Sequence, residues 1–458
     1  MIKANIFKAY DIRGIVGQEL DEQGAYIIGR AYGVFMKDTH PSKKLFAVVV
    51  QADAREHSPR LKNGLIEGLI AEHINIIDGG LATTPMHYFS VNHAGADGGI
   101  MVTASHNPAS YNGFKLTRRG AVPIGKDSGM EEIKQIALRG IFDKEDKKGS
   151  EKNLSHKQDF KKPYIDFLLE HISVSSVKPF RVVIDTGNGM VGHVLPLLLK
   201  RLPIEVFPLY FDIDMRFPYH TANPLDTSTL KDLIAKVLEV QADFGIAFDG
   251  DGDRIGFVDE NGRIVQNDLI TAFLADSMLK KHKGGKIVYD LRSSRIVPET
   301  IASNGGAALE SKVGHAFIKS LMRKENAVFG GELSGHYYFK DFFFADSALF
   351  AFLYFLEILS LQKMPFSSVV APYRAYVSSG EINFQVGSQE TFLEGIALHF
   401  KDAKKLYWLD GLTVTYDDWW FNLRMSNTEP VARLNVEADN EWLLKENLEN
   451  LKRLIEKS

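Results

Sequence analysis

The chain has 458 residues, of which 45% are hydrophobic and 24% are charged, and its formal net charge is −4. This composition is that of a globular protein of about three domains, and it gives no support for a nucleic-acid or anionic-membrane partner. Because the chain has no cysteine, disulfides and thiolate metal sites are excluded, and we expect a reducing, cytoplasmic location.

The N-terminal stretch MIKANIFKAYDIRG lacks the apolar core of a signal peptide. After it, short β-branched runs alternate with helical patterns such as residues 61–73. The alternation predicts β-α-β units with mixed or mainly parallel sheets. It restarts twice, which indicates three similar α/β domains. The predicted strands are residues 45–53, 74–80, 99–105, 180–190, 204–211, 242–254, 285–295, 307–315 and 326–336.

Two stretches mark domain boundaries. Residues 143–162 are charged and polar, as in a solvated connector, and residues 362–373 follow an apolar helix predicted over residues 347–361. A membrane span needs about 20 apolar residues, so we expect this helix to be buried, with no membrane partner. The final segment, with alternating strands and an amphipathic helix, predicts a smaller α+β unit.

We therefore expect four domains. Three α/β domains cover residues 1–148, 152–256 and 257–366, and a smaller α+β domain covers residues 369–458. In open α/β sheets, ligand-binding groups gather where strands end at their carboxyl side. Four of the predicted strand ends carry unusual polar residues.

The segment DGDGDR follows a predicted buried strand and indicates a metal site. Asp249, Asp251 and Asp253 repel one another unless a cation lies among them, and oxygen ligands favour Mg²⁺ or Ca²⁺ over zinc. An EF-hand is an alternative, since Glu260 falls at the twelfth position of such a loop. Against it, Arg254 stands where an EF-hand has glycine, and a strand enters the loop. An acidic turn without a metal is a second alternative.

The segment TASHNP places Ser105 and His106 at another strand end. As an isolated motif it could be a turn, because Ser, Asn and Pro all favour turns. A hydrolase with a Ser-His-Asp triad is disfavoured, because the nucleophile motif G-x-S-x-G is absent. A hydroxyl opposite a metal site is suited to carrying a phosphoryl group, whose oxygens would be further metal ligands. Ser105 is therefore a candidate phosphoserine.

Two further loops carry binding groups. In GELSGH, Glu332, Ser334 and His336 are spaced by two and would face one way if extended, as suits sugar hydroxyls. In RMSNTEP, an arginine, hydroxyls and an amide crowd one loop between strands, which is the chemistry of a phosphate site. Its members are Arg424, Ser426, Asn427 and Thr428.

Together and in this order, these motifs give the chain its resemblance to a family. It resembles the α-D-phosphohexomutases, most closely the bacterial phosphomannomutase/phosphoglucomutase branch, and the resemblance extends from KAYDIRG to RMSNTEP. It implies four domains around a central cleft, to which each domain contributes one strand-end loop.

The resemblance also assigns roles to individual residues. It implies that Ser105 is phosphorylated and that Asp249, Asp251 and Asp253, with an oxygen on Ser105, hold Mg²⁺. Lys115, His106 and His336 are the candidate bases, in that order, and Arg254 would neutralise charge. The implied substrate-binding residues are Tyr10, Arg13, Arg292, His315, Glu332, Ser334, His336, Arg424, Ser426, Asn427 and Thr428.

The implied reaction interconverts hexose 1-phosphate and hexose 6-phosphate. Phospho-Ser105 would give its phosphoryl group to a hexose phosphate, forming a 1,6-bisphosphate that turns over and returns its other phosphate. Glucose 1,6-bisphosphate or mannose 1,6-bisphosphate would then act as activator. We expect a monomer or weak dimer.

Two positions depart from the family pattern. Arg292 stands where many relatives carry lysine, and Leu333 stands where glucosamine-phosphate enzymes usually carry glutamine and mannose/glucose enzymes methionine. Leucine, which is apolar like methionine, favours mannose and glucose phosphates. The alternatives are a phosphoglucosamine mutase, a Mg²⁺-dependent sugar-phosphate phosphatase, and a non-catalytic sugar-phosphate binder.

Overall fold

The structure is a computed structural model that describes residues 2–142, 155–386, 392–425 and 431–457. The chain divides into two compact units. The first comprises Met1–Val265 and Ser334–Phe366, and the second comprises Gln266–Leu333 and Ser367–Ser458.

The first sheet of the first unit has the order β1-β5-β4-β2-β3-β7, with β6 beside β5. β2, β3, β4 and β7 are parallel, and β5 runs antiparallel to β4, β1 and β6. The central strands are rich in valine and isoleucine and are buried on both faces, as expected of a covered parallel sheet. The strands are β1 (Ile12–Ile15), β2 (Ala47–Ala52), β3 (Asn75–Leu81), β4 (Gly98–Val102), β5 (Tyr111–Arg118), β6 (Val122–Pro123) and β7 (Ser155–Lys157).

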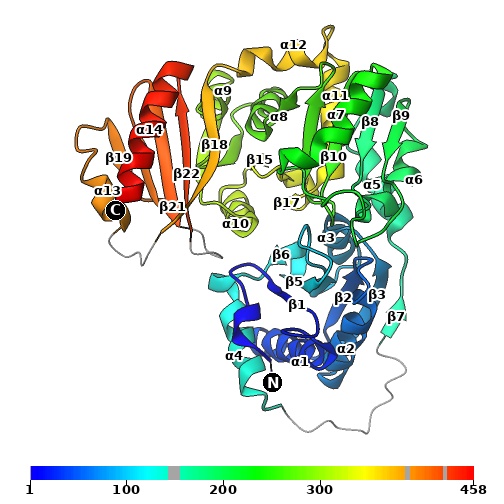
Figure 1. Cartoon of the computed structure of the whole chain (residues 1–458). Helices are drawn as coiled ribbons and strands as arrows, with labels where there is room; N and C mark the ends of the chain where they lie inside the picture. Colours follow the sequence, from blue (N-terminus) through cyan, green and yellow to red (C-terminus); the bar gives the residue numbers. More distant parts are fainter. Residues whose placement is uncertain (1, 143–154, 387–391, 426–430, 458) are drawn as a thin grey trace. The chain divides into compact units, whose positions relative to one another are not determined.

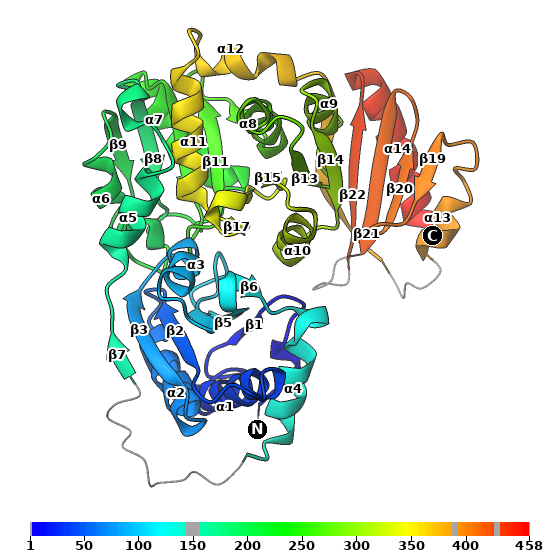
Figure 2. The ribbon, with the colours of Figure 1, turned by 180° about the vertical axis from the view of Figure 1, so that it is seen from behind.

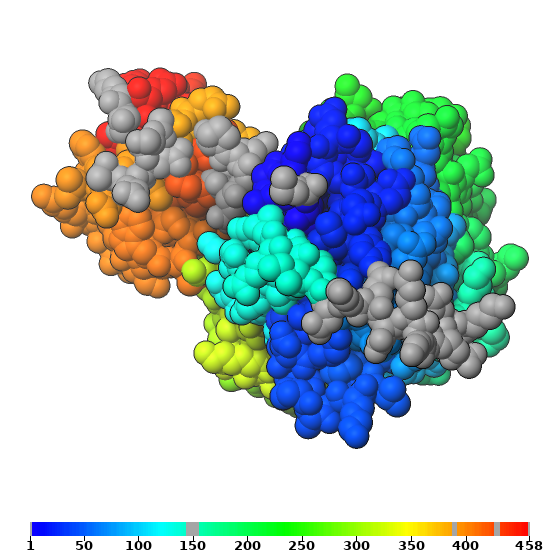
Figure 3. Space-filling view, turned by 90° about the horizontal axis from the view of Figure 1, so that it is seen from below, coloured from blue at the N-terminus to red at the C-terminus, as the bar shows by residue number. Residues whose placement is uncertain are grey.

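Helices cover both faces of this sheet. α1 (Glu22–Thr39), α2 (Ser58–Ala71) and α4 (Met130–Arg139) lie on one face, and α3 (Thr84–His93) lies on the other, as Figures 1 and 2 show. Side chains of this domain form much of the surface seen from below in Figure 3, in blue to cyan. α1 and α2 pack closely because both have glycine at the contact. A Cβ on Gly29 would lie 2.3 Å from the carbonyl oxygen of Leu65.

The second sheet also belongs to the first unit and has the order β12-β11-β10-β8-β9. β8, β9 and β10 are parallel, whereas β11 and β12 are antiparallel to their neighbours. β10 is fully buried and ends immediately before Asp249. The elements are β8 (Arg181–Asp185), β9 (Glu205–Leu209), β10 (Phe244–Phe248), β11 (Ile255–Asp259), β12 (Ile264–Val265), α5 (Lys161–Leu169), α6 (Leu195–Leu199) and α7 (Lys231–Val240).

The apolar segment predicted as a buried helix is α11 (Ala348–Ser360), and that prediction is confirmed. Ser347 caps it by accepting a hydrogen bond from the backbone N–H of Phe350. α11 lies in the first unit with the antiparallel pair β16 (Tyr337–Phe339) and β17 (Ala345–Asp346), and α12 (Phe366–Val370) follows it in the chain. Within the described ranges, no helix has the length and apolarity that a membrane span requires.

The second unit begins with parallel strands β13 (Lys286–Asp290), β14 (Ala307–Ser311) and β15 (Phe329–Gly331). Helices α8 (Asn267–Lys281), α9 (Ile296–Ser303) and α10 (His315–Glu325) alternate with them. The C-terminal part is an antiparallel sheet of order β18-β22-β21-β20-β19, with the predicted last helix as α14. Its elements are β18 (Val377–Gln385), β19 (Lys405–Tyr407), β20 (Leu412–Thr415), β21 (Trp419–Met425), β22 (Val431–Ala438), α13 (Phe392–Ala397) and α14 (Glu441–Lys457).

Candidate active site

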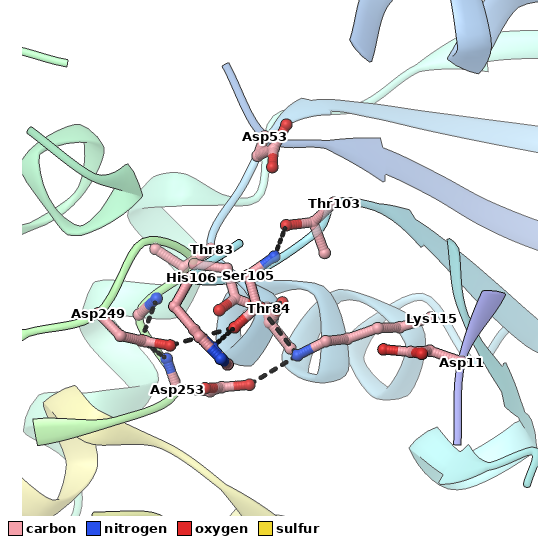
Figure 4. Close-up of polar contacts among 12 residues, drawn as sticks. Asp11, Asp53, Thr83, Thr84, Thr103, Ser105, His106, Lys115, Asp249 and Asp253 are labelled. Atoms are coloured by element: carbon pink, nitrogen blue, oxygen red, sulfur yellow. Dashed lines mark hydrogen bonds and ion pairs between the residues drawn. The ribbon is translucent and has the colours of Figure 1, made fainter. Parts of the chain in front are cut away.

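Ser105 follows β4 in a left-handed backbone conformation, with φ of 54°. Such a conformation is uncommon for a residue with a side chain and marks a functional constraint when the surroundings enforce it. The Ser105 N–H donates to Oγ1 of Thr103 at 3.0 Å, and its hydroxyl donates to Asp249 at 3.2 Å (Figure 4). His106 Nδ1 also lies 3.2 Å from Ser105 Oγ. This conformation turns the Ser105 hydroxyl toward the loop that carries Asp249, Asp251 and Asp253 (the aspartate loop).

Arg55, which the sequence analysis did not single out, enforces this loop conformation. Its guanidinium donates to the carbonyl oxygens of Ser105, Asn107, Pro108 and Tyr111 at 2.7 to 3.1 Å. The charge is balanced by Asp53, which is fully buried. Arg55 is 1% exposed, so it is a structural component of the serine loop. The arginine just after strand β2 was the available sequence signal.

The aspartate loop joins β10 to β11 and curls around the side chain of Asp249. Asp249 Oδ1 accepts hydrogen bonds from the N–H groups of Gly252, Asp253 and Arg254 at 3.0 to 3.1 Å. Gly252 has φ of 76°, which favours glycine, and a Cβ there would lie 2.7 Å from Val191. The turn brings Asp249, Asp251 and Asp253 together, with one oxygen of each within 4.8 Å of the others.

These residues fit a hard divalent cation. All three carboxylates are buried, and Asp251 Oδ1 has no hydrogen-bond partner among the described residues. Burial, together with the charges of Asp253 and Asp251, raises the pKa of Asp249 well above its usual value. Oxygen ligands in this arrangement suit Mg²⁺ or Ca²⁺. Strands flank the loop on both sides, so the EF-hand alternative is wrong.

Lys115 projects from β5 onto the same carboxylates. Its ammonium donates to Asp251 at 2.8 Å and to Asp253 at 2.7 Å (Figure 4). Burial alone would lower the pKa of Lys115, but the two aspartates outweigh it and raise that pKa well above its usual value. A second contact, which the sequence analysis missed, is Thr84 at the start of α3, whose hydroxyl donates to Asp251 at 2.5 Å.

The histidines differ in their surroundings. Burial and the nearby charges of Arg254 and Arg13 lower the pKa of His106 well below its usual value, so its ring is neutral. His336 lies beside β16, with Nε2 3.2 Å from Asp253 and Nδ1 2.8 Å from the hydroxyl of Ser334. Arg254 Nε reaches His336 at 3.4 Å. The structure therefore brings Ser334, His336 and Arg254 to the edge of the aspartate loop.

Arg13 lies on β1, which pairs with β5, and its side chain contacts Asn107 of the serine loop and Asp11. Burial would lower the pKa of Arg13, but Asp11, Asp251 and Asp253 raise it. Tyr10 lies two residues before this strand and is half-buried. Arg13, His106, Lys115 and the three aspartates of the first unit thus gather around Ser105.

In the second unit, Asp290 at the end of β13 fixes the first residues of the GELSGH segment. Its carboxylate accepts hydrogen bonds from three nitrogens of Arg292 and, at 2.8 Å, from the N–H of Leu333. Arg292 also lies 3.4 Å from Glu332. Burial would lower the pKa of Arg292, but Asp290 and Glu332 raise it. Asp290 was not predicted, although its place at a strand end was a signal.

Two further predicted residues of this unit are described. Arg424 is the penultimate residue of β21, is 3% exposed, and donates to Glu381 of β18 at 2.9 Å. His315 is the first residue of α10 and is half-buried. Ser426, Asn427 and Thr428 lie outside the described residues.

Models of four consecutive family domains match the chain. Domains I, II and III of phosphoglucomutase/phosphomannomutase, each described as alpha/beta/alpha, match residues 4–144, 162–262 and 266–376, and its C-terminal domain matches residues 381–453. The chain belongs to the phosphoglucomutase/phosphomannomutase family.

Relatives in this family match over their full length. A phosphomannomutase of Vibrio cholerae is 42% identical, covering 100% of the chain and 99% of the relative. A phosphomannomutase of Methanocaldococcus jannaschii is 41% identical, covering 99% and 98%. The crystal structure of a phosphoglucomutase/phosphomannomutase family protein from Burkholderia thailandensis has a TM-score of 0.91 at 33% identity, covering 100% of the chain and 98% of that structure.

Membership of the phosphoglucomutase/phosphomannomutase family confirms the predicted resemblance and the predicted architecture of three α/β domains and a smaller C-terminal domain. It also confirms the predicted class of enzyme, an intramolecular phosphotransferase. The domain limits and the role of each site residue stay predictions, since family membership does not test them.

Proposed function

We propose that this phosphohexomutase interconverts the 1- and 6-phosphates of mannose and of glucose through a phosphoserine at Ser105. The observation that carries the proposal is the contact between the Ser105 hydroxyl and Asp249. Asp249 is one of three buried carboxylates in the aspartate loop. A serine hydroxyl with an ordinary turn role would not need a left-handed conformation fixed by a buried arginine. Relatives named phosphomannomutase support the sugar assignment.

In the first half-reaction, a hydroxyl of the sugar phosphate attacks the phosphorus of phospho-Ser105 as the bond to Ser105 Oγ breaks. Mg²⁺, held by Asp249, Asp251, Asp253 and an oxygen on Ser105, would neutralise charge on the transferring group. Lys115 is charged and adds to this neutralisation. The attacking hydroxyl would give its proton to the neutral ring of His106, which suits a base better than the charged Lys115, and His106 would return a proton to Ser105 Oγ through their contact. The second half-reaction returns the other phosphate to Ser105.

A second set of residues would recognise the sugar phosphate. We assign the non-reacting phosphate to Arg292 and Arg424, because guanidinium groups bind phosphate through paired hydrogen bonds. Glu332 would accept hydrogen bonds from sugar hydroxyls, with Ser334, His336, His315, Tyr10 and Arg13 as further binding residues. Leu333 offers an apolar side chain beside Glu332, which favours hexoses without an amine. Asp290 would set the place of Leu333 through its N–H.

Three further properties belong to the same proposal. A trace of glucose 1,6-bisphosphate or mannose 1,6-bisphosphate would phosphorylate Ser105 and so activate the enzyme. We expect a monomer or weak dimer and a cytoplasmic location. Ser426, Asn427 and Thr428 remain predicted phosphate ligands.

The test follows each 6-phosphate formed from mannose 1-phosphate, glucose 1-phosphate or glucosamine 1-phosphate, with Mg²⁺ and a trace of glucose 1,6-bisphosphate. We expect comparable turnover of the first two and none with Ser105→Ala. Dominant turnover of glucosamine 1-phosphate would show that Leu333 does not select against the amine. Release of inorganic phosphate without isomerisation would identify a phosphatase, and binding without either reaction a non-catalytic protein.

A further inference from the structure

Two arginines face each other on the C-terminal sheet. Arg424 of β21 is directly opposite Arg433 of β22 in the antiparallel register. Their neighbours Leu423 and Leu434 point to the other face, into the buried core of this domain. Because side chains alternate along a strand, the leucines on the core face force both guanidinium groups onto the same, opposite face of the sheet. Like charges directly opposite each other destabilise a sheet unless an anion lies between them.

Glu381 of β18 supplies that anion. It lies two residues before Asn383, which pairs with Arg433, so its side chain shares the arginine face. Its carboxylate is 2.9 Å from Arg424 and 3.5 Å from Arg433, and Arg292 approaches it to 3.4 Å. Burial would raise the pKa of Glu381, but the charges of Arg292, Arg424 and Arg433 outweigh it and lower that pKa.

The arginines differ in how firmly they are held. Arg292 is held by Asp290 through its Nε and Nη2, and the contact of its Nη1 with Glu381 is a long one. Arg424 Nε is buried without a hydrogen-bond partner among the described residues. Glu381 contacts Arg424 only through Nη2, so the carboxylate leaves a donor of this guanidinium unused. A phosphate dianion, with more oxygens and twice the charge, matches such a fork better.

The carboxylate of Glu381 therefore contacts Arg292 and Arg424, the same arginines that we assign to the substrate's phosphate. Its side chain is 25% exposed, whereas those of Arg424 and Arg292 are 4% and 8% exposed. The carboxylate of Glu381 is thus more exposed than the two guanidinium groups of Arg292 and Arg424, and it has room to move toward solvent. Six charged groups, Asp290, Arg292, Glu332, Glu381, Arg424 and Arg433, sum to zero, and loss of Glu381 alone would leave a net positive charge.

We propose that Glu381 is a displaceable counter-ion that competes with the phosphate of the sugar for Arg292 and Arg424. This inference rests on the proposed function, which places the phosphate at these arginines. Competition keeps phosphate affinity moderate, and a bisphosphate intermediate that must turn over needs such moderate affinity. When the phosphate displaces Glu381, the negative charge of the phosphate replaces that of the carboxylate beside the opposed pair Arg424 and Arg433.

The test titrates the full-length protein, without Mg²⁺, with inorganic phosphate in a calorimeter. We expect Glu381→Gln to bind about tenfold more tightly than the wild type, equivalent to about 1.4 kcal/mol. Glu381→Asp, whose shorter side chain contacts Arg424 less well, should fall between them and guards against misfolding of the first variant. Glu299→Gln removes the same charge from a residue that bonds Tyr376 and should change nothing.

The double variant Glu381→Gln/Arg424→Ala locates the effect. If the gain in phosphate affinity disappears in it, the gain arises at the arginine cluster. Unchanged or weaker binding by Glu381→Gln and Glu381→Asp would overturn the proposal, because Glu381 would then only hold the arginines in place. The titration needs no turnover, so a protein without mutase activity but with tighter phosphate binding would contradict the proposed function and leave the counter-ion role standing.

Discussion

At the scale of single residues, Arg55 fixes the backbone conformation that places the Ser105 hydroxyl. The buried guanidinium contacts four carbonyl oxygens of the serine loop and the carboxylate of Asp53. A carbonyl-rich turn with a residue in the left-handed region opens unless such donors hold it. The position of the Ser105 hydroxyl therefore depends on a residue fifty positions away in the chain.

We predict that Arg55→Met lowers kcat by about a hundredfold, because a displacement of about 1 Å at a reacting group has an effect of this size. It also leaves Asp53 buried without its partner, which destabilises a protein by about 3 to 5 kcal/mol. The measurements are steady-state kinetics and thermal unfolding. The double variant Asp53→Asn/Arg55→Met should recover much of the stability and little of kcat. Recovery of both would show that Arg55 acts only through stability.

A second prediction concerns the three aspartates. Mg²⁺ should raise the thermal unfolding temperature of the wild type, since a ligand at a hundred times its Kd stabilises by about 2.7 kcal/mol. Asp251→Asn should abolish most of this shift, because Asp251 Oδ1 is the carboxylate oxygen without a partner. Asp243→Asn, in the second domain but outside the loop, is the control. A full Mg²⁺ shift in Asp251→Asn would place the metal elsewhere.

At the scale of elements, the first domain depends on the close approach of α1 and α2. Gly29 and Gly68 form the contact, and a Cβ on Gly68 would lie 2.1 Å from the carbonyl oxygen of Tyr26. Backbone atoms cannot move aside as a flexible side chain can. The helix pair in turn supports the sheet that carries β2, β4 and the serine loop.

We expect Gly29→Ala to destabilise the protein by about 1 to 3 kcal/mol through overpacking, despite the higher helix propensity of alanine. Gly395→Ala is the matched control, because Gly395 is also helical but has open space where its Cβ would lie. That variant should be neutral or slightly stabilised. Urea unfolding followed by circular dichroism gives both values. Equal stability of Gly29→Ala and the wild type would show that α1 and α2 can move apart to accept the methyl group without loss of stability.

The start of α8 gives a pH-dependent prediction. Burial raises the pKa of Asp268 to about 6, with Glu437 and Asp290 adding to the effect and the N–H groups of Ser294 and Leu269 opposing it. The unfolded chain loses this proton near the ordinary pKa of about 3.9, so between that pH and 6 the folded state binds more protons. Stability therefore falls as pH rises through this window, by about 3 kcal/mol in total.

Asp268→Asn removes this titration. Relative to the wild type, the variant should gain stability from pH 4 to pH 7, on top of a constant difference from the altered hydrogen bonds. Thermal unfolding of both proteins across that range measures the change. A difference that does not vary with pH would show that Asp268 keeps its ordinary pKa in the folded protein.

At the scale of the whole molecule, the residues proposed for phosphoryl transfer and those proposed to bind the substrate's other phosphate belong to different units. Ser105, the aspartates and Lys115 belong to the first, whereas Arg292 and Arg424 belong to the second. The proposed reaction therefore requires each unit to supply a different interaction with one substrate. Substitutions in the two units should differ in their measured effects.

Arg424→Ala should raise KM for mannose 1-phosphate by about 10- to 100-fold, since a hydrogen bond to a charged group contributes about 1.5 to 3 kcal/mol. It should leave the Mg²⁺-induced rise in unfolding temperature intact. Asp251→Asn should abolish most of the Mg²⁺-induced rise in unfolding temperature. It should also lower kcat more than it raises KM. Loss of the Mg²⁺ effect in Arg424→Ala would contradict this separation of roles.

Much of the architecture and of the family assignment follows from local patterns in the amino-acid sequence. Short strands ending in polar residues predicted the α/β domains, and the spacing of Asp249, Asp251 and Asp253 predicted the metal loop, because both patterns are local. The ordered motifs predicted the family, which four matching domain models confirm.

Only the tertiary structure placed the partners of these motifs. Lys115 contacts Asp251 across 136 residues of chain, Arg55 contacts Ser105 across 50, and Arg424 contacts Glu381 across 43. No local pattern carries such pairs, because strand register and the contacts between loops at strand ends decide which side chains meet. Lysine and arginine are common on protein surfaces, so their sequence signal is weak until folding buries them beside a carboxylate or a carbonyl oxygen.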